Sequence, residues 1–543
     1  MVRSSLSEWC QSLGPTCDVL VVGGGATGLG VAVQAALEGR RVAVLEARDF
    51  ACGTSSRSTK LLHGGVRYLA QGRFALVREA LRERAIVLRL APHLAQPLPF
   101  VVAQRQWGPW ALTALGLKLY QWLAGRLSLG PSQWLGAAAL HRLMPSLSGA
   151  VAGVRYWDGQ FEDARLALAL ARTAQAAGAH VRNHTRVVGL DQREGAWAVH
   201  LQDGVSQERC TVHARSVVNA TGVWVDALRQ LLPSAQPATQ AHGPRRAPLV
   251  RPSSGVHLVV SRDKLPLQEA VLVPRTSDGR VLFALPWLGA TVIGTTDTPR
   301  EQAVLEPRPL PQELDFLFKE TERALGVRLQ AADVRSVWVG LRPLVDTGQG
   351  AGGPATSTLS REHLIAREAP GFVTVTGGKW TTYRVMAEEV LACLVHAGDL
   401  AAPARPAQTR TQGLWGAAQT GQAAVSLREP PGLHLLGSAM DELADLPGQD
   451  QVLGLGLSEA MVRHSARREW AVTVEDMLAR RWRVLFLDSR AAQAMAPRVA
   501  QLLQEETGLD PDLAGFLAQC QLYRLDTAAA QNAAATDDME KPL

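Results

Sequence analysis

The chain has 543 residues, of which 47% are hydrophobic and 20% charged. It is too long for one simple domain, and its composition is that of a globular protein with a sizeable core. The net charge of +6 comes from dispersed residues, which argues against nucleic acid and suits an anionic ligand or membrane surface. No run reaches the roughly 18 apolar residues of a spanning helix. The N-terminal residues lack the apolar core of a signal peptide. We therefore expect a soluble or membrane-surface protein.

Six cysteines are scattered along the chain without a C-x-x-C pair, and thirteen histidines show no H-E-x-x-H spacing. These patterns predict reduced thiols in a cytosolic setting. They also give no reason to expect a metal site.

The first predicted strand ends in a glycine motif. Residues 17–22 are a short, continuous apolar run, and Gly23, Gly25 and Gly28 follow as G-x-G-x-x-G. In a dinucleotide-binding unit the first glycine permits the turn, the second lets a pyrophosphate approach the backbone, and the third lets helix pack on strand. A glycine turn with a purely structural role is the alternative.

The elements after the motif favour the dinucleotide. A helix is expected over residues 26–38, and its N-terminus would offer free N–H groups to phosphates. A second strand over residues 41–45 ends at Glu46, which lies 18 residues after Gly28. That spacing is close to the one expected for an acid on a ribose hydroxyl.

Three later segments indicate which dinucleotide is bound. Residues 49–69 read as a polar loop followed by a glycine-bounded turn, residues 214–222 as a strand ending in A-T-G, and residues 372–382 as an apolar strand followed by GGKWTT. Separate segments that converge on one dinucleotide are typical of FAD enzymes.

The rest of the chain divides into further predicted elements without an internal repeat. We expect helices over residues 71–90, 161–177, 458–464 and 469–483, a strand over 181–188, a loop over 232–248, a linker over 400–420 and a disordered tail from 526. A group of arginines near the end would either contact acidic lipids or form a solvated face: Arg467, Arg468, Arg480, Arg481 and Arg483.

Residues 107–136 form an unusual apolar segment that is rich in tryptophan. A helix here would place four apolar residues on one face, Leu115, Leu119, Trp122 and Leu123. Trp107, Trp110 and Trp134 add amphipathic rings, and Lys118 and Arg126 add positive charge. This combination suits the plane of a membrane interface. An ordinary core helix is the alternative.

Six motifs between Asp18 and Arg384 together resemble the FAD-dependent glycerol-3-phosphate dehydrogenases of the quinone-linked, membrane-associated type. They are GTSSRSTKLLHGGVRYL, FEDARL, VVNATGVWVD, LPWLGATVIGTTD, GLRPL and TGGKWTTYR. The resemblance implies an α/β fold: a Rossmann-like FAD-binding domain of the D-amino-acid-oxidase/glutathione-reductase type, a β-rich substrate domain and a helical C-terminal domain.

The expected domains alternate along the chain. The FAD-binding domain is assigned residues 16–98, 151–240 and 339–399, and the substrate domain residues 99–150 and 241–338. A linker (400–420), a C-terminal helical domain (421–525) and a disordered tail (526–543) complete the chain.

The resemblance also implies roles for individual residues. The substrate phosphate is assigned to Arg67, Arg361 and Lys379, with Tyr68 beside them, and Thr295 and Thr296 would line the substrate. His257, Arg342 and His63 are the candidate catalytic residues. The cofactor contacts are assigned to Gly23, Gly25, Ala26, Thr27, Gly28, Glu46, Thr54, Ser55, Ser56, Leu61, His63, Gly64, Val187, Ala220, Gly222, Gly378, Lys379 and Thr381.

Each of these assignments has a plainer alternative. An isolated arginine is usually a solvated surface charge, a histidine such as His63 or His257 can be a hydrogen-bonded structural residue, and Ser55 and Ser56 can be turn residues.

The activity implied is oxidation of sn-glycerol 3-phosphate to dihydroxyacetone phosphate, with hydride passing to flavin N5 and electrons passing to a membrane quinone. The expected place is the cytoplasmic face of a bacterial inner membrane, with a homodimer left open. Three alternatives stay open: an oxygen-using glycerol-3-phosphate oxidase, a related flavoprotein that oxidises another small acid, and a non-catalytic flavin-binding or membrane-docking module.

Overall fold

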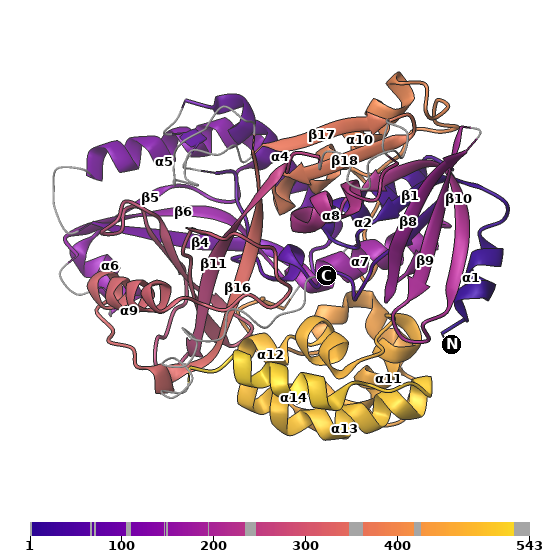
Figure 1. Ribbon diagram of the computed structural model, residues 1–543. Helices are drawn as coiled ribbons and strands as arrows, with labels where there is room; N and C mark the ends of the chain where they lie inside the picture. The colour runs from indigo at the N-terminus through magenta and orange to yellow at the C-terminus, as the bar shows by residue number, and fades with distance from the viewer. Residues whose placement is uncertain are drawn as a thin grey trace.

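The computed structural model describes residues 3–525 except 66–67, 70–71, 105–109, 146, 148–149, 194, 234–245, 347–361 and 418–424. The described residues form two large sheets and a C-terminal group of helices. In Figure 1 the first sheet lies on the right, the second on the left, and the C-terminal helices, in yellow and orange, lie below both.

The first sheet is centred on β1 (Cys17–Val22), the strand predicted before the glycines. β1 pairs in parallel with β2 and β10, and its residues from Val19 to Val21 are fully buried. Burial on both faces explains the continuous apolar run, because strands of parallel sheets are covered on each side. The other strands are β2 (Val42–Leu45), β7 (His180–Arg182), β8 (Thr185–Arg193), β9 (Ala196–Asp203), β10 (Arg209–Asn219), β17 (His363–Ala369) and β18 (Phe372–Gly377).

Helices cover this sheet and buttress its edges. α2 (Ala26–Leu37) packs against both α7 and α10. The helices and 3₁₀ helices of this part are α1 (Leu6–Ser12), η1 (Thr54–Ser56), α4 (Phe74–Leu90), α7 (Asp163–Ala176), η3 (Gly222–Trp224), α8 (Val225–Arg229), η6 (Trp380–Thr382) and α10 (Tyr383–His396).

The second sheet is largely antiparallel. β11 (Val250–Ser261) pairs with β16 along almost its whole length and with β14 on its other side. The other strands are β3 (Leu61–Leu62), β4 (Ala95–Gln104), β5 (Gln133–Gly136), β6 (Ala152–Phe161), β12 (Ala270–Val273), β13 (Leu282–Trp287), β14 (Ala290–Gly294), β15 (Thr298–Pro299) and β16 (Val334–Val345). Outside the sheet lie α5 (Trp110–Ala124), η2 (Gly125–Leu127), α6 (Ala137–Leu143), α9 (Pro311–Leu325) and η4 (Ala331–Asp333).

The C-terminal part is mainly helical, as expected. Its elements are η7 (Leu433–Leu443), β19 (Val452–Gly454), β20 (Leu457–Ser458), α11 (Glu459–Arg468), the π-helix η8 (Asp476–Arg481), α12 (Val484–Leu487), α13 (Ser489–Thr507) and α14 (Leu513–Leu522). The predicted helix over 469–483 is thus shorter than expected. The predicted tail, 526–543, lies outside the described residues.

Several other element boundaries differ from those predicted. The strand expected over residues 181–188 is two strands, β7 and β8, which are separated at Asn183–His184. His184 has a positive φ of 47°, which interrupts the extended backbone between them. The helix expected from residue 161 begins at Asp163, because Phe161 is still part of β6.

The domain boundaries expected from the sequence stay predictions, but four strands of the second sheet lie wholly or partly in ranges assigned to the FAD-binding domain. Two of them are β3 and the start of β4, within residues 16–98. β6 belongs to the second sheet although residues 151–240 were assigned to the FAD-binding domain. β16 runs on to Val345 in the second sheet, past the expected boundary at residue 338. Strand pattern alone does not show which sheet a strand joins.

The lipid or solvent face predicted for the late arginines is wrong for Arg480, Arg481 and Arg483, which are all buried. Arg480 and Arg481 both pair with Asp49, which follows β2. They therefore dock the C-terminal domain onto the first sheet. A buried guanidinium needs such carboxylate partners, because it is costly to move a charge out of water without a counter-ion.

Candidate active site

The glycine motif lies where β1 passes into α2. Gly23 has a φ of 114°, and a Cβ there would overlap the carbonyl oxygen of Ala220. A Cβ on Gly28 would overlap the carbonyl oxygen of Gly23. These two glycines are needed by the protein's own packing. At Gly25, the residue before α2, the nearest protein atom to a Cβ is the Ser55 hydroxyl at 3.0 Å, so this glycine borders space rather than backbone.

Glu46 lies at the end of β2 beside that loop. One of its carboxylate oxygens accepts the Gly24 N–H at 2.7 Å and the other accepts the Arg48 N–H at 3.0 Å. Burial raises its pKa, and the two backbone N–H groups act in the opposite direction. The glutamate therefore orders the glycine loop.

The loop that contains η1 joins the glycine motif to two distant segments. The Ser55 hydroxyl accepts the Ala26 N–H at 2.9 Å, at the start of α2. The Ser55 carbonyl accepts from the indole of Trp380 at 2.8 Å, and the Thr54 hydroxyl donates to the carbonyl of Leu341 at 2.6 Å. The predicted residues Thr54, Ser55 and Thr381 are thereby brought into one neighbourhood, and Ser56 is buried in the same loop.

The A-T-G segment and the TGG turn meet on the far side of the glycine loop. Ala220 contacts Gly23, and the carbonyl of Gly222 accepts from the Thr376 hydroxyl at 3.2 Å. Gly378 has a φ of 72°, and a Cβ there would overlap the Met386 sulfur. The three segments expected to converge on a dinucleotide thus lie together.

His63 and Gly64 follow the short strand β3, in which Leu61 is buried. The Gly64 N–H donates to the Tyr120 hydroxyl at 2.8 Å, and this hydroxyl donates to Asp158 at 2.8 Å. The buried Arg84 pairs with Asp158. These contacts fix the position of the turn that contains His63 and Gly64. Val187 is buried in β8, and its contact with the cofactor stays a prediction.

Arg342 and the Gly294–Thr296 segment form one cluster. Its guanidinium donates to the Thr295 hydroxyl at 3.2 Å and to the Thr296 carbonyl at 3.1 Å. The guanidinium also lies 3.5 Å from a carboxylate oxygen of Asp297. The Thr296 hydroxyl instead points inward, where it donates to the buried Glu313 at 2.8 Å. Thr295 therefore suits a substrate contact better than the side chain of Thr296.

Lys379 and Tyr68 form the second cluster. The Lys379 ammonium lies 3.9 Å from the centroid of the Tyr68 ring, a cation–π contact. Gly65 lies against the same pair, because a Cβ there would be 3.4 Å from the ammonium. The other two predicted phosphate ligands, Arg67 and Arg361, lie outside the described residues.

His257 lies on β11 and is buried. Its ring stacks on Trp338 at 4.0 Å, and its Nε2 lies 3.0 Å from the Thr59 hydroxyl. A Cβ on Gly294 would overlap the ring, so the histidine adjoins the threonine segment. Burial, followed by the charges of Lys60 and Arg342, lowers the pKa of His257 well below its usual value. The imidazole is therefore neutral near pH 7.

Comparison with known proteins identifies the fold. Residues 18–384 match the family described as FAD dependent oxidoreductase, and residues 434–513 match the C-terminal domain of alpha-glycerophosphate oxidase. The chain belongs to this FAD-dependent oxidoreductase family. The α/β FAD-binding fold with a helical C-terminal domain, expected from the sequence, is confirmed.

Full-length relatives narrow the family. The chain is 36% identical to the mitochondrial glycerol-3-phosphate dehydrogenase SDP6 of Arabidopsis thaliana over 535 residues, covering 90% of this chain and 82% of the relative. It is 35% identical to the mitochondrial glycerol-3-phosphate dehydrogenase of Homo sapiens, covering 91% and 71%. A crystal structure of the glycerol-3-phosphate dehydrogenase from Bacillus halodurans complexed with FAD superposes with a TM-score of 0.72, at 26% identity and 99% coverage of both chains. The predicted family is confirmed.

The cofactor of this family member is FAD. The described site fits it: Gly25 and Ala26 would face its pyrophosphate at the start of α2, and Glu46 would face a ribose. Ser55 would stand beside the phosphates, since its hydroxyl already lies at the helix N-terminus.

The structure also shows a network of buried charges next to the η1 loop, which the sequence-based site assignments did not include. Lys60 is fully buried, pairs with Asp163 at 2.7 Å and donates to the Ser56 carbonyl at 2.8 Å. Arg483 reaches the same Ser56 carbonyl at 2.6 Å and pairs with Glu162 at 2.9 Å. Burial lowers the pKa of Lys60 to about 7, with Asp163 opposing this shift. A lysine in a polar loop gives no sequence signal of burial, although the acidic pair in FEDARL marks where a cation is needed.

Proposed function

We propose that the chain oxidises sn-glycerol 3-phosphate to dihydroxyacetone phosphate and passes the electrons to a membrane quinone. The observation that carries this proposal is that two cationic clusters, Arg342 with Thr295 and Lys379 with Tyr68, adjoin the loop that would hold FAD. The residue before Arg342 and the residue after Lys379 both hydrogen-bond to that loop. One cluster suits the reacting carbinol and the other suits a phosphate dianion.

In this proposal Lys379 binds the substrate phosphate, assisted by Arg67 and Arg361, and Tyr68 restrains the ammonium. Thr295 and Arg342 hold the C2 oxygen, where negative charge develops as the hydroxyl proton leaves. FAD, when bound, supplies the acceptor for the hydride from C2. His63 lies on the turn after β3, and we place this turn beside the reacting centre.

His257 is the proposed proton acceptor, either directly or through the hydroxyl of Thr59, which lies 3.0 Å from its Nε2. Because burial, and then the charges of Lys60 and Arg342, disfavour a charged imidazole, His257 is a weak base without bound substrate. A bound phosphate dianion would offset those two cations and make proton transfer easier. Substrate binding would thus raise the pKa of His257 and make it a better proton acceptor.

The quinone acceptor is supported by an exposed apolar surface around α5. Leu115 is 67% exposed and Trp122 is 72% exposed, while Leu127 and Trp134 are exposed nearby. Lys118 and Arg126 lie on the same segment and are exposed as well. We propose that this surface, the α5 patch, rests on a membrane and presents the enzyme to a lipid-dissolved acceptor.

The opposite face of α5 serves the core, so the helix has two apolar faces. Leu117, Tyr120 and Ala124 are buried. Leu119 and Leu123, expected on the interface, pack in part against the core. Among the described residues, no helix has both the length and the apolar character needed to cross a bilayer. A surface association is therefore proposed, and the cytoplasmic face of a bacterial inner membrane stays a prediction.

The second candidate function is the oxygen-using oxidase. It is favoured by the match of residues 434–513 to the C-terminal domain of alpha-glycerophosphate oxidase. The α5 patch favours the dehydrogenase, because oxygen reaches a flavin without a membrane. Oxygen uptake and peroxide formation in the absence of quinone distinguish the two.

The test of the proposed substrate is anaerobic addition of glycerol 3-phosphate to the purified yellow protein. We expect the oxidised flavin absorbance to bleach and one dihydroxyacetone phosphate to form per flavin. Unphosphorylated glycerol should bleach it only at far higher concentration. A flavin that stays oxidised with glycerol 3-phosphate but bleaches with an amino acid would contradict the proposal.

A further inference from the structure

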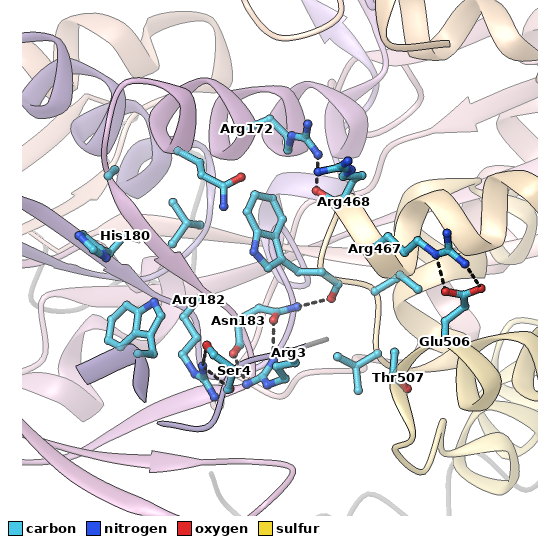
Figure 2. Close-up of a pocket in the computed structure, with 18 residues that line it drawn as sticks. Arg3, Ser4, Arg172, His180, Arg182, Asn183, Arg467, Arg468, Glu506 and Thr507 are labelled. Carbon is cyan, nitrogen blue, oxygen red and sulfur yellow. Dashed lines mark hydrogen bonds and ion pairs between the residues drawn. The ribbon is translucent and has the colours of Figure 1, made fainter. Parts of the chain in front are cut away.

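A cavity of about 290 Å³ lies where four parts of the chain meet (Figure 2). Its walls come from the N-terminal segment with α1, the end of α7 with β7, the segment around the end of α11, and the end of α13. None of the described residues assigned to cofactor or substrate lines it. The cavity is therefore separate from the candidate active site.

The lining of this cavity is strongly basic. Five arginines line it but only one carboxylate, Glu506, and the arginines are Arg3, Arg172, Arg182, Arg467 and Arg468. Figure 2 shows Arg172 and Arg468 on one side of the cavity and Arg3 and Arg182 on the opposite side. An anion entering between them would meet guanidinium groups from two directions.

The carboxylates around the cavity do not balance these charges. Arg3 and Arg182 donate to the same oxygen of the buried Asp203, at 2.8 and 2.7 Å. Arg172 pairs with Glu442 at 3.2 Å, and Arg467 shares Glu506 with a further arginine, Arg463. Within the described part of the chain, no carboxylate forms an ion pair with the exposed Arg468. The cavity thus holds more positive than negative charge.

Burial adds to the imbalance. Desolvation, followed by the charge of Arg182, lowers the pKa of Arg3. Desolvation also lowers the pKa of Arg172. Both shifts mean that the surroundings destabilise the positive charge, and a bound anion would relieve that cost.

The cavity also offers aromatic surface. Trp9 and Trp470 belong to its lining, and the guanidinium of Arg182 lies 5.9 Å from the Trp9 ring centroid. Guanidinium groups bind phosphate through paired N–H donors, and indole rings give a flat apolar wall to an organic group. We propose that this cavity is a binding site for a small phosphorylated organic molecule, with the phosphate on the arginines and the organic part against Trp470.

Contacts behind the cavity connect it to the cofactor loop. The side-chain amide of Asn183 donates to Asp49 at 3.0 Å and to the carbonyl of Trp470 at 2.8 Å. The carbonyl of Arg182 accepts the N–H of Glu46 at 3.0 Å. A ligand here would add links between the N-terminal segment, the first sheet and the C-terminal domain, and so raise the stability of the folded holoenzyme.

Calorimetric titration of the holoenzyme tests the proposal, with pyrophosphate, AMP and adenosine as probes. We expect one site for AMP, weaker binding of pyrophosphate and none of adenosine, together with a higher Tm on AMP binding. The double variant Arg467→Ala/Arg468→Ala changes only exposed side chains, so it should fold and keep its flavin spectrum. It should weaken AMP binding by about 10- to 100-fold, the loss of charge-assisted contacts.

Two controls locate the effect. Arg328→Ala, which removes an exposed arginine after α9, should leave AMP binding unchanged. Lys379→Ala should also leave it unchanged, because this lysine belongs to the candidate active site. The double variant should leave KM for glycerol 3-phosphate unchanged, so this inference and the proposed function can fail separately.

Three results would overturn the site: no binding of AMP or pyrophosphate, unchanged binding in the double variant, or binding abolished by Lys379→Ala. Binding of pyrophosphate without AMP would overturn the placement of an organic group on Trp470.

Discussion

At the scale of single residues, the glycines of the first loop differ in what surrounds them. Gly23 and Gly28 are required by backbone contacts, whereas only a hydroxyl lies within reach of a Cβ on Gly25. The sequence motif treats the three alike. Gly25 is therefore the glycine that we expect to face the ligand, and it is the position where cofactor binding and folding can be separated.

Gly25→Val should abolish FAD binding while leaving the fold largely intact, because the valine methyl groups would occupy the space of the pyrophosphate. Flavin absorbance after purification and circular dichroism measure the two effects. Gly136→Val, at an open glycine before α6 with a φ of −73°, is the matched control and should stay yellow. A folded Gly25→Val protein with full FAD content would refute the assignment of Gly25 to the pyrophosphate.

Lys379→Ala should raise KM for glycerol 3-phosphate and leave the flavin spectrum unchanged. The lost contact to phosphate is worth on the order of 2–3 kcal/mol, or roughly 30- to 150-fold. Activity with unphosphorylated glycerol should change little, and Lys379→Arg should recover part of the loss. Lys319→Ala, on the exposed side of α9, serves as the control. Equal losses with both substrates would place the phosphate site elsewhere.

His257→Ala should lower the rate of flavin reduction about 10²- to 10⁴-fold, the usual effect of losing a general base. Because its pKa is lowered, the proton-accepting form of His257 persists below pH 6.5. In the wild type, the acid limb due to His257 should therefore lie below pH 6.5 at subsaturating substrate, where the rate reports the pKa of the free enzyme. Stopped-flow reduction from pH 5 to 9 measures this, with His396→Ala as the control. A limb at or above pH 6.5 that vanishes in His257→Ala would contradict this environment.

At the scale of elements, the cofactor loop is held from both sides. Two side chains donate hydrogen bonds to the Ser56 carbonyl. One is Lys60, from the loop itself, and the other is Arg483, from the start of α12 in the C-terminal domain. Arg483 has a φ of 60° and is fully buried. The C-terminal domain is thus part of the support of the active site rather than a separate appendage.

Arg483→Met should destabilise the holoenzyme by about 3–5 kcal/mol, because it leaves Glu162 and Asp163 buried with Lys60 as their main remaining cation. FAD should also dissociate more readily, since the Ser56 carbonyl loses a donor. Denaturant unfolding and FAD release on dilution are the measurements. Arg328→Met, at an exposed site, should change stability by less than about 0.5 kcal/mol. A similar small change in Arg483→Met would show that the network is not required.

At the scale of the whole molecule, local signals were predicted well from sequence and long-range partners were not. The strand, helix and glycines over residues 17–38 follow local rules, and the structure places them there. The burial of Arg480, Arg481 and Arg483 depends on Asp49 and Glu162, hundreds of residues away. Their spacing resembles that of a solvated face, so the sequence pattern could not reveal the partners.

The α5 patch illustrates the same limit on a larger surface. The sequence predicts an apolar helical face with tryptophans, but it does not show which residues the core takes. In the structure Leu117, Tyr120 and Ala124 are buried, whereas Leu115 and Trp122 are exposed. Two exposed apolar residues on a helix that already has a buried face need another explanation than folding.

Leu115→Ser/Trp122→Ser should therefore weaken binding to vesicles that contain anionic lipid and lower quinone reductase activity. Activity with a water-soluble dye should survive, because the flavin and phosphate clusters are untouched. Exposed apolar rings gain free energy at the headgroup boundary, and Lys118 and Arg126 add an attraction that salt weakens. Vesicle sedimentation at low and high salt, with both activity assays, measures these effects.

Leu433→Ser/Val452→Ser is the matched control for the α5 patch. It removes two exposed apolar residues from the C-terminal domain and should leave vesicle binding unchanged. Because Leu115 and Trp122 are mostly exposed, the patch variant should keep a Tm close to that of the wild type. If it instead loses dye activity and Tm together, the segment supports the fold rather than the membrane. If vesicle binding persists with the fold intact, another surface carries the attachment.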